Sequence, residues 1–97
     1  MTTEPSTQST PARTPAEAAE MIAGARIRID ALDRQIIGLV QERMATSAEI
    51  QAARISAGGT RVALNREMEI LARYRDALGP QGTEVAMQLL QLCRGRA

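Results

Sequence analysis

The sequence predicts an all-α fold: a three-helix chain with one long N-terminal helix and two short helices after it. Apolar residues recur every three or four positions along residues 22–57, 64–78 and 83–94, which is the spacing of a helix face. No stretch alternates apolar and polar residues as a strand does. Gly58-Gly59 and Gly79-Pro80 separate the three periodic stretches. The chain of 97 residues is long enough for one domain.

The first thirteen residues are predicted to be a disordered tail, and residues 14–97 the folded domain. The tail is rich in proline, threonine and serine and offers almost nothing apolar to bury. Directly after it, Thr14 is placed to cap a helix, Pro15 suits the first helical position, and Glu17 completes a capping box. A helix is therefore expected to begin at Pro15.

The long helix carries a heptad-like apolar seam that runs to the Gly-Gly break. Its a positions are Ile22, Ile29, Ile36, Arg43, Ile50 and Ala57, and its d positions are Ala25, Leu32, Leu39, Thr46 and Ala53. From Pro15 to Ala57 the helix is roughly 64 Å long, whereas a compact domain of this size has a radius of gyration of about 12–13 Å. A second copy must cover the seam, which predicts an intertwined homodimer. A plain coiled-coil pair is the alternative, and it leaves the short helices little to cover.

The two short helices are bounded by glycine and proline. Asn65 is expected to cap the second helix, and Gly79-Pro80 is expected to end it. The apolar positions of this helix are Leu64, Met68, Leu71, Tyr74 or Arg75, and Leu78. Thr83 is expected to cap the third helix, which closes at Gly95. The broad apolar face of the third helix is formed by Val85, Ala86, Leu89, Leu90, Leu92 and Cys93.

Composition excludes several function classes. The 12 basic residues are all arginine, the net charge is +1, and Tyr74 is the one aromatic residue, so neither a broad basic field nor a stacking platform for nucleic acid exists. Without histidine and with one cysteine, no zinc site or Ser-His or Cys-His pair forms, and no metal or cofactor is expected. No apolar run spans a membrane and no signal pattern opens the chain. The single thiol, Cys93, is expected to fill space on a helix in a reducing cytoplasm.

Arg43 interrupts the seam between Ile36 and Ile50. A guanidinium that faces a helical core is costly unless it is paired. Arg43 could form an ion pair with a carboxylate of a neighbouring chain (Asp33, Glu42 or Glu49), or it could be a polar residue that sets the register of the helices. Alternatively, it borders a cavity that is open to an anion. Arg54 lies three turns further on nearly the same face, and Arg66-Glu67 opens the second helix just after the Gly-Gly break.

Arg26 can join this group from a second copy. If two long helices pack antiparallel and cross near residues 34–35, Arg26 of one chain comes level with Arg43 of the other. Several guanidiniums favour planar carboxylates, which arginine binds through two hydrogen bonds. Each arginine alone is also compatible with a solvated surface charge.

Residues 22–96 resemble the all-helical (type II) chorismate mutases, which convert chorismate to prephenate. The resemblance rests on Arg26, Ile29-Asp30-Ala31-Leu32-Asp33, Arg43, Arg54 and Arg66-Glu67. The loop Ser56-Ala57-Gly58-Gly59-Thr60-Arg61, the short third helix and the ending Arg94-Gly95-Arg96 are similar to those of the actinobacterial subclass typified by the intracellular mycobacterial enzyme.

The resemblance implies a role for each of the matching residues. Arg26 of the partner chain, Arg43 and Arg66 would bind the two carboxylates of chorismate. Arg54 would contact a carboxylate and the ether oxygen of the breaking bond, and Glu67 would receive the ring hydroxyl. This Claisen rearrangement is unimolecular and needs neither proton transfer nor a cofactor, so conformational restriction and fixed cations suffice.

Departures from the family pattern imply a weak catalyst that a partner activates. A glutamine that donates to the ether oxygen in well-studied relatives would fall beyond Ala97, Ala63 stands in place of an aspartate, and Arg54 is bulkier than the lysine of those relatives. Members of the resembled subclass are activated by 3-deoxy-D-arabino-heptulosonate 7-phosphate (DAHP) synthase, so Arg94, Gly95 and Arg96 are expected to dock on that enzyme. Two other functions stay open: an isochorismate-pyruvate lyase of the same fold, and a non-catalytic helical interaction module.

Overall fold

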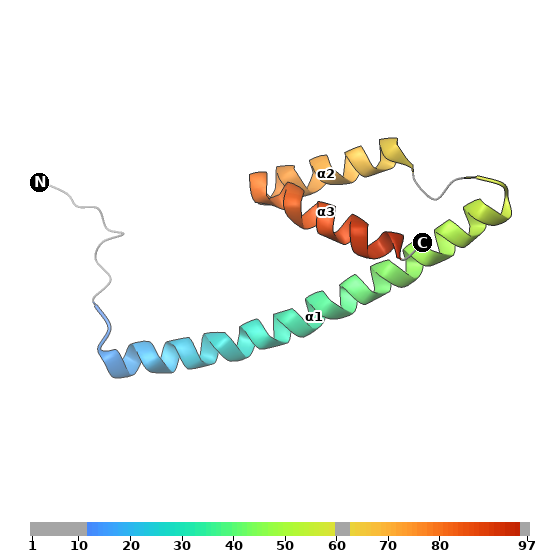
Figure 1. The fold of residues 1–97 in the computed structure, drawn as a ribbon. Coiled ribbons are helices and arrows are strands. Elements are labelled where there is room, and N and C mark those ends of the chain that lie inside the picture. The colour runs from blue at the N-terminus through green and yellow to red at the C-terminus, as the bar shows by residue number, and fades with distance from the viewer. Residues whose placement is uncertain (1–11, 60–62, 96–97) are drawn as a thin grey trace, which may run out of the picture. The chain divides into compact units, whose positions relative to one another are not determined.

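The computed structural model describes residues 12–59 and 63–95, and the regular elements over these residues are all helices (Figure 1). It contains α1 (Pro15–Ser56), α2 (Leu64–Leu78) and α3 (Pro80–Arg94). The predicted three-helix class with one long N-terminal helix is confirmed. Residues 1–11 of the expected tail lie outside the described residues. The chain divides into two units, Met1–Gln35 and Ile36–Ala97, and α1 runs through both.

The predicted capping box forms at the start of α1. The backbone N–H of Glu17 donates to Thr14 Oγ1 over 3.1 Å, and the backbone N–H of Thr14 donates to Glu17 Oε1 over 2.9 Å. These two bonds satisfy donors that the first helical turn leaves without a partner. The helix begins at Pro15 as predicted.

The end of α1 is closed by backbone hydrogen bonds around Gly58. The helix ends at Ser56, one residue before the predicted Ala57. Gly58 has a φ of +85°, the left-handed conformation that glycine adopts freely. The N–H groups of Gly59 and Gly58 donate to the carbonyls of Arg54 (2.7 Å) and Ile55 (3.0 Å), a Schellman closure. Arg54 therefore lies in a turn with a fixed backbone.

Two expected helix starts are wrong, and the error at the third helix has a backbone cause. Ala63, not Asn65, is the N-cap of α2, and no side chain caps that helix. The third helix begins at Pro80, three residues before the expected cap Thr83. Gly79, with a φ of +88°, ends α2 and begins α3 at the same residue. Pro80 then takes the first helical position, where its missing N–H costs nothing.

The core of the second unit lies between α2 and α3. Ile70, Ala86 and Leu90 are buried, and Leu71 and Tyr74 pack against them. Gly82 makes the close approach possible, because a Cβ at this position would lie 2.2 Å from the Tyr74 carbonyl oxygen. This corner holds α2 and α3 together as one body.

The apolar faces expected for the short helices are correct only in part. On α2 the expected Leu64, Met68 and Leu78 are exposed, while Ile70, which the pattern did not select, is buried. On α3 the expected Ala86, Leu90 and Cys93 are buried, but Val85 and Leu92 are half exposed. Each short helix carries apolar residues around more than one face, and only one face can meet the other helix.

No residue of α1 is buried in the single chain. Large apolar side chains of the predicted seam, including Ile22, Ile29, Leu32, Ile36 and Leu39, are exposed. The intertwined homodimer that would cover them stays a prediction. In the described part of the chain, no helix combines the length and the apolar character that crossing a membrane requires.

Candidate active site

A cavity of about 260 Å³ lies within the unit Ile36–Ala97. Residues of all three helices border it. They are Arg43, Thr46, Ser47, Ile50, Gln51, Arg54, Ala63, Arg66, Glu67, Ile70, Leu90, Cys93 and Arg94. The structure thus brings together four residues proposed from the sequence for the site: Arg43, Arg54, Arg66 and Glu67.

One face of α1 supplies four polar side chains to the cavity. Arg43, Ser47, Gln51 and Arg54 follow one another at intervals of four, four and three residues, the spacing that aligns side chains along one side of a helix. All four are half-buried. A regular helix is therefore enough to point two guanidiniums into the same space.

The guanidinium of Arg43 reaches the last turn of α3. Its Nη1 donates to Cys93 Sγ over 2.8 Å. Among the described residues of this chain, it forms no salt bridge with a carboxylate. Arg43 borders a cavity, which agrees with one of the alternatives. The pairing with a carboxylate of a neighbouring chain and the register-setting role both stay untested.

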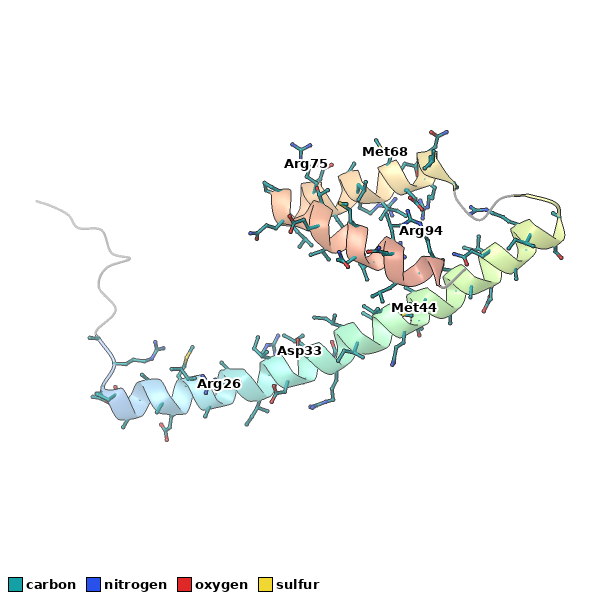
Figure 2. All side chains as sticks on the ribbon, in the orientation of Figure 1. Arg26, Asp33, Met44, Met68, Arg75 and Arg94 are labelled. Atoms are coloured by element: carbon teal, nitrogen blue, oxygen red, sulfur yellow. The ribbon has the colours of Figure 1, made fainter. Side chains whose placement is uncertain are left out.

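Glu67 lies at the cavity in an ion pair with Arg94. Arg94, labelled on α3 in Figure 2, donates from Nη2 to Glu67 Oε1 over 2.6 Å. The Glu67 side chain is 18% exposed and that of Arg94 is 44% exposed. The short distance and the shielding of Glu67 favour this pair, while the exposure of Arg94 lets solvent weaken it.

Sequence reasoning assigned Arg94 to the docking tail and missed its place at the cavity. The signal was present in the helical spacing, because Arg94 follows the core residue Leu90 by one turn. Gly95 follows α3 directly, with a φ of +70°. Arg96 lies outside the described residues, so its predicted docking role has no structural test.

Arg66 and Arg26 are held less firmly. Arg66 lines the cavity, but its Nη1 pairs with Glu69 Oε1 at 3.3 Å and both side chains are more than half exposed, so this pair fixes it weakly. Arg26 belongs to the other unit and is exposed on α1 (Figure 2). Within one chain, Arg26 is not among the residues that border the cavity.

Two hydrogen bonds at the cavity were not predicted. Ser47 Oγ and Gln51 Nε2 donate to the backbone carbonyl of Cys93 over 3.2 and 3.0 Å. Cys93 is buried as expected of an apolar filler, yet it also receives three polar side chains of α1. Nothing in the local sequence identifies this contact, because it joins residues more than forty positions apart.

The chemical character of the cavity is that of an anion site. Four guanidiniums, from Arg43, Arg54, Arg66 and Arg94, border it together with one carboxylate, that of Glu67. Across residues 12–59 and 63–95, no three His, Cys, Asp or Glu side chains come together as a metal site would require. Such a cavity suits a small molecule with more than one carboxylate.

Comparison with known proteins decides the family. Residues 25–92 match the chorismate mutase type II family. The chain belongs to this family. The match contains Arg26, Arg43, Arg54 and the Arg66-Glu67 pair, and the expectation of an all-helical chorismate mutase is confirmed.

Named relatives come from mycobacteria. The chain is 51% identical over 71 residues to the intracellular chorismate mutase of Mycolicibacterium smegmatis, an alignment that covers 73% of this chain and 68% of the relative. It is 46% identical to the intracellular chorismate mutase of Mycobacterium tuberculosis, with 73% and 67% covered. These names confirm the actinobacterial subclass and favour a mutase over an isochorismate-pyruvate lyase or a non-catalytic module.

A solved structure shares the fold. It is the non-covalent complex of DAHP synthase and chorismate mutase from Corynebacterium glutamicum with a bound transition state analog. The similar chain in that complex has a TM-score of 0.78 and 37% sequence identity, and the match covers 86% of this chain and 99% of that chain.

Proposed function

We propose that this chorismate mutase converts chorismate to prephenate in the cavity bordered by Arg43, Arg54, Arg66 and Glu67. The observation that carries the proposal is the convergence of these four side chains, separated by up to 24 positions in sequence, on one space. They are the residues for which family resemblance implies substrate contacts.

Binding rests on the two carboxylates of chorismate. Arg43 and Arg66 of one chain and Arg26 of a second copy each offer a planar fork of donors that matches a carboxylate. Held at both carboxylates, the substrate keeps its enolpyruvyl arm over the ring, and this restriction lowers the entropic part of the barrier. No proton needs to move.

Rate acceleration beyond restriction comes from Arg54. As the ether C–O bond lengthens, its oxygen gains negative charge, and a fixed cation beside it stabilises the transition state more than the ground state. The Schellman closure that includes the Arg54 carbonyl supports this role, because it fixes the backbone from which the guanidinium extends. The Glu67 carboxylate accepts a hydrogen bond from the ring hydroxyl. Arg94 donates a hydrogen bond to one of its two oxygens, Oε1.

The complete site requires a homodimer. Arg26 lies in the unit Met1–Gln35, and the exposed apolar seam of α1 supports pairing with a second copy. In an antiparallel pair that crosses near residues 34–35, Arg26 of each copy lies level with Arg43 of the other. Each of the two active sites is then built by both chains.

DAHP synthase is the activating partner in this proposal. The Corynebacterium complex supports it, as does Ala63, which stands where the resembled enzymes carry an aspartate. Arg94, Gly95 and Arg96 form the docking segment. Because Arg94 also holds Glu67, docking at this segment has a direct physical route to the active site. The names of the relatives and the single free thiol support a cytoplasmic location.

The test is a prephenate assay on the purified full chain, alone and with the DAHP synthase of the same organism. We expect saturable prephenate formation that is slow alone and faster with the synthase. Pyruvate release from isochorismate, measured in parallel, should be absent. Lack of prephenate formation under both conditions would leave a non-catalytic module as the function.

A further inference from the structure

The last turn of α3 is fastened to α1 by two hydrogen bonds to one atom. Ser47 Oγ and Gln51 Nε2, one helical turn apart, both donate to the carbonyl oxygen of Cys93. This carbonyl is among the last four of α3, which have no partner inside the helix. Two donors fill its two acceptor positions.

The fastened residue carries contacts to two residues of the proposed active site. The Sγ of Cys93 accepts a hydrogen bond from Arg43 Nη1. The next residue along α3, Arg94, donates to the carboxylate of Glu67. The position of this turn therefore affects both the guanidinium proposed to bind a carboxylate and the carboxylate proposed to receive the ring hydroxyl.

We propose that Ser47 and Gln51 are positioning residues, which hold the end of α3 so that Arg43 and Glu67 keep their places in the cavity. The catalytic consequence rests on the proposed function, whereas the fastening itself does not. Because the two donors share one acceptor, loss of one leaves the other in place. Single substitutions are expected to have small effects and the double substitution a large one.

Cys93 provides a probe of the fastening that is independent of catalysis. It is the only cysteine of the chain, and it is 5% exposed. Its reaction with N-ethylmaleimide, followed by mass spectrometry on the full chain, reports how often the last turn of α3 opens. Loss of two hydrogen bonds is expected to raise the rate about tenfold.

The test variant combines Ser47→Ala with Gln51→Met. It removes both hydrogen-bond donors and keeps the length of the side chain at position 51. Two matched controls are available. Ser47→Thr keeps the hydroxyl, and Gln41→Met makes the same change at an exposed position of the same helix. We expect the double variant to react about tenfold faster with N-ethylmaleimide and to lose about tenfold in kcat/KM, while both controls resemble the original chain.

The outcomes separate the proposal from its rivals. An unchanged thiol reaction in the double variant would overturn the fastening, even if kcat/KM falls, because Ser47 and Gln51 would then act by touching the substrate. A faster thiol reaction with unchanged kcat/KM would overturn the positioning role. If the original chain makes no prephenate, the proposed function fails while the thiol comparison still decides the fastening. Should the double variant not fold, Ser47→Ala and Gln51→Met are each compared with Gln41→Met. A small rise in the thiol reaction is then expected for each single variant, and no rise in either would overturn the fastening.

Discussion

Arg54 occupies a position that suits a cation acting on the transition state. It is half-buried, borders the cavity, and extends from the last turn of α1, whose carbonyls are closed by Gly58 and Gly59. Its proposed contribution therefore depends on where the guanidinium is held.

Replacement of Arg54 by alanine is expected to lower kcat by about 10²–10³-fold, with a smaller change in KM, because the charge it faces develops only in the transition state. Steady-state kinetics of prephenate formation measure both constants. Arg73→Ala, at an exposed position of α2 away from the cavity, is the control and should leave both unchanged. A rise in KM with kcat intact would assign Arg54 to substrate binding alone.

Residues that share one helix face could be predicted from the sequence, whereas contacts between helices could not. Arg43 and Arg54 follow from a three-turn spacing, and Glu67 from its place beside Arg66 at the start of a helix. The contacts of Arg94 with Glu67 and of Gln51 with Cys93 depend on how α3 ends against its neighbours. Local periodicity does not contain that information.

The α2–α3 corner depends on the absence of a side chain at Gly82. A Cβ there would meet Tyr74 O at 2.2 Å and the Tyr74 carbonyl carbon at 2.8 Å, both of them backbone atoms that cannot swing aside. The helices would have to separate, and the core of Ile70, Ala86 and Leu90 lies directly between them.

Gly82→Ala is expected to lower the free energy of unfolding by at least about 1–3 kcal/mol, the usual cost of overpacking. Urea unfolding at fixed protein concentration measures it. Gly38→Ala is the matched control, since nothing lies within 4 Å of a Cβ at that helical position. That substitution should raise the free energy of unfolding by about 0.5–1 kcal/mol. Equal effects of the two changes would show that the corner is not close-packed.

At the scale of elements, helix existence was predictable and two helix starts were not. Periodicity and the Gly-Gly break predicted three helices, and the capping box at Thr14 and Glu17 predicted the start of α1. Asn65 and Thr83 are reasonable caps by residue type, but Gly79 and Pro80 join α2 and α3 without an intervening loop. Thr83 therefore lies inside the third helix instead of before it.

At the scale of the whole molecule, the single chain leaves the apolar seam of its long helix exposed. No residue of α1 is buried, and an exposed apolar surface of this kind supports the proposed pairing with a second copy. The sequence predicted this exposure, because the long helix is longer than a compact domain of this size can cover. The structure agrees with that prediction, and the homodimer remains a proposal.

Ile29→Asp is expected to abolish the dimer, because it places a charge on the a position of the seam without a partner. Sedimentation equilibrium measures the change in mass. Ile27→Asp is the control: Ile27 is 70% exposed and Ile29 53%, but Ile27 lies off the seam, so its replacement should leave the dimer intact. Dissociation by both variants, or by neither, would contradict an interface along the seam.

The proposed activation by DAHP synthase should depend on the docking segment. Arg96→Ala removes a charge from the proposed docking segment and leaves the Arg94–Glu67 pair in place. We expect prephenate formation by the chain alone to be nearly unchanged and the increase caused by the synthase to be reduced. Titration of the synthase into a prephenate assay measures both. Full activation of the variant would remove Arg96 from the docking segment.

The most direct test of a site shared between two copies is a mixed dimer of Arg26→Ala and Arg54→Ala chains, formed by refolding the two together. In a shared arrangement one of the two sites in each mixed dimer receives both substitutions and the other receives none. We predict that the mixture regains about a quarter of the prephenate-forming activity of the original chain, since half of the dimers are mixed and each has one intact site. If the mixture is no more active than the separate variants, each site is built by one chain and the account is wrong.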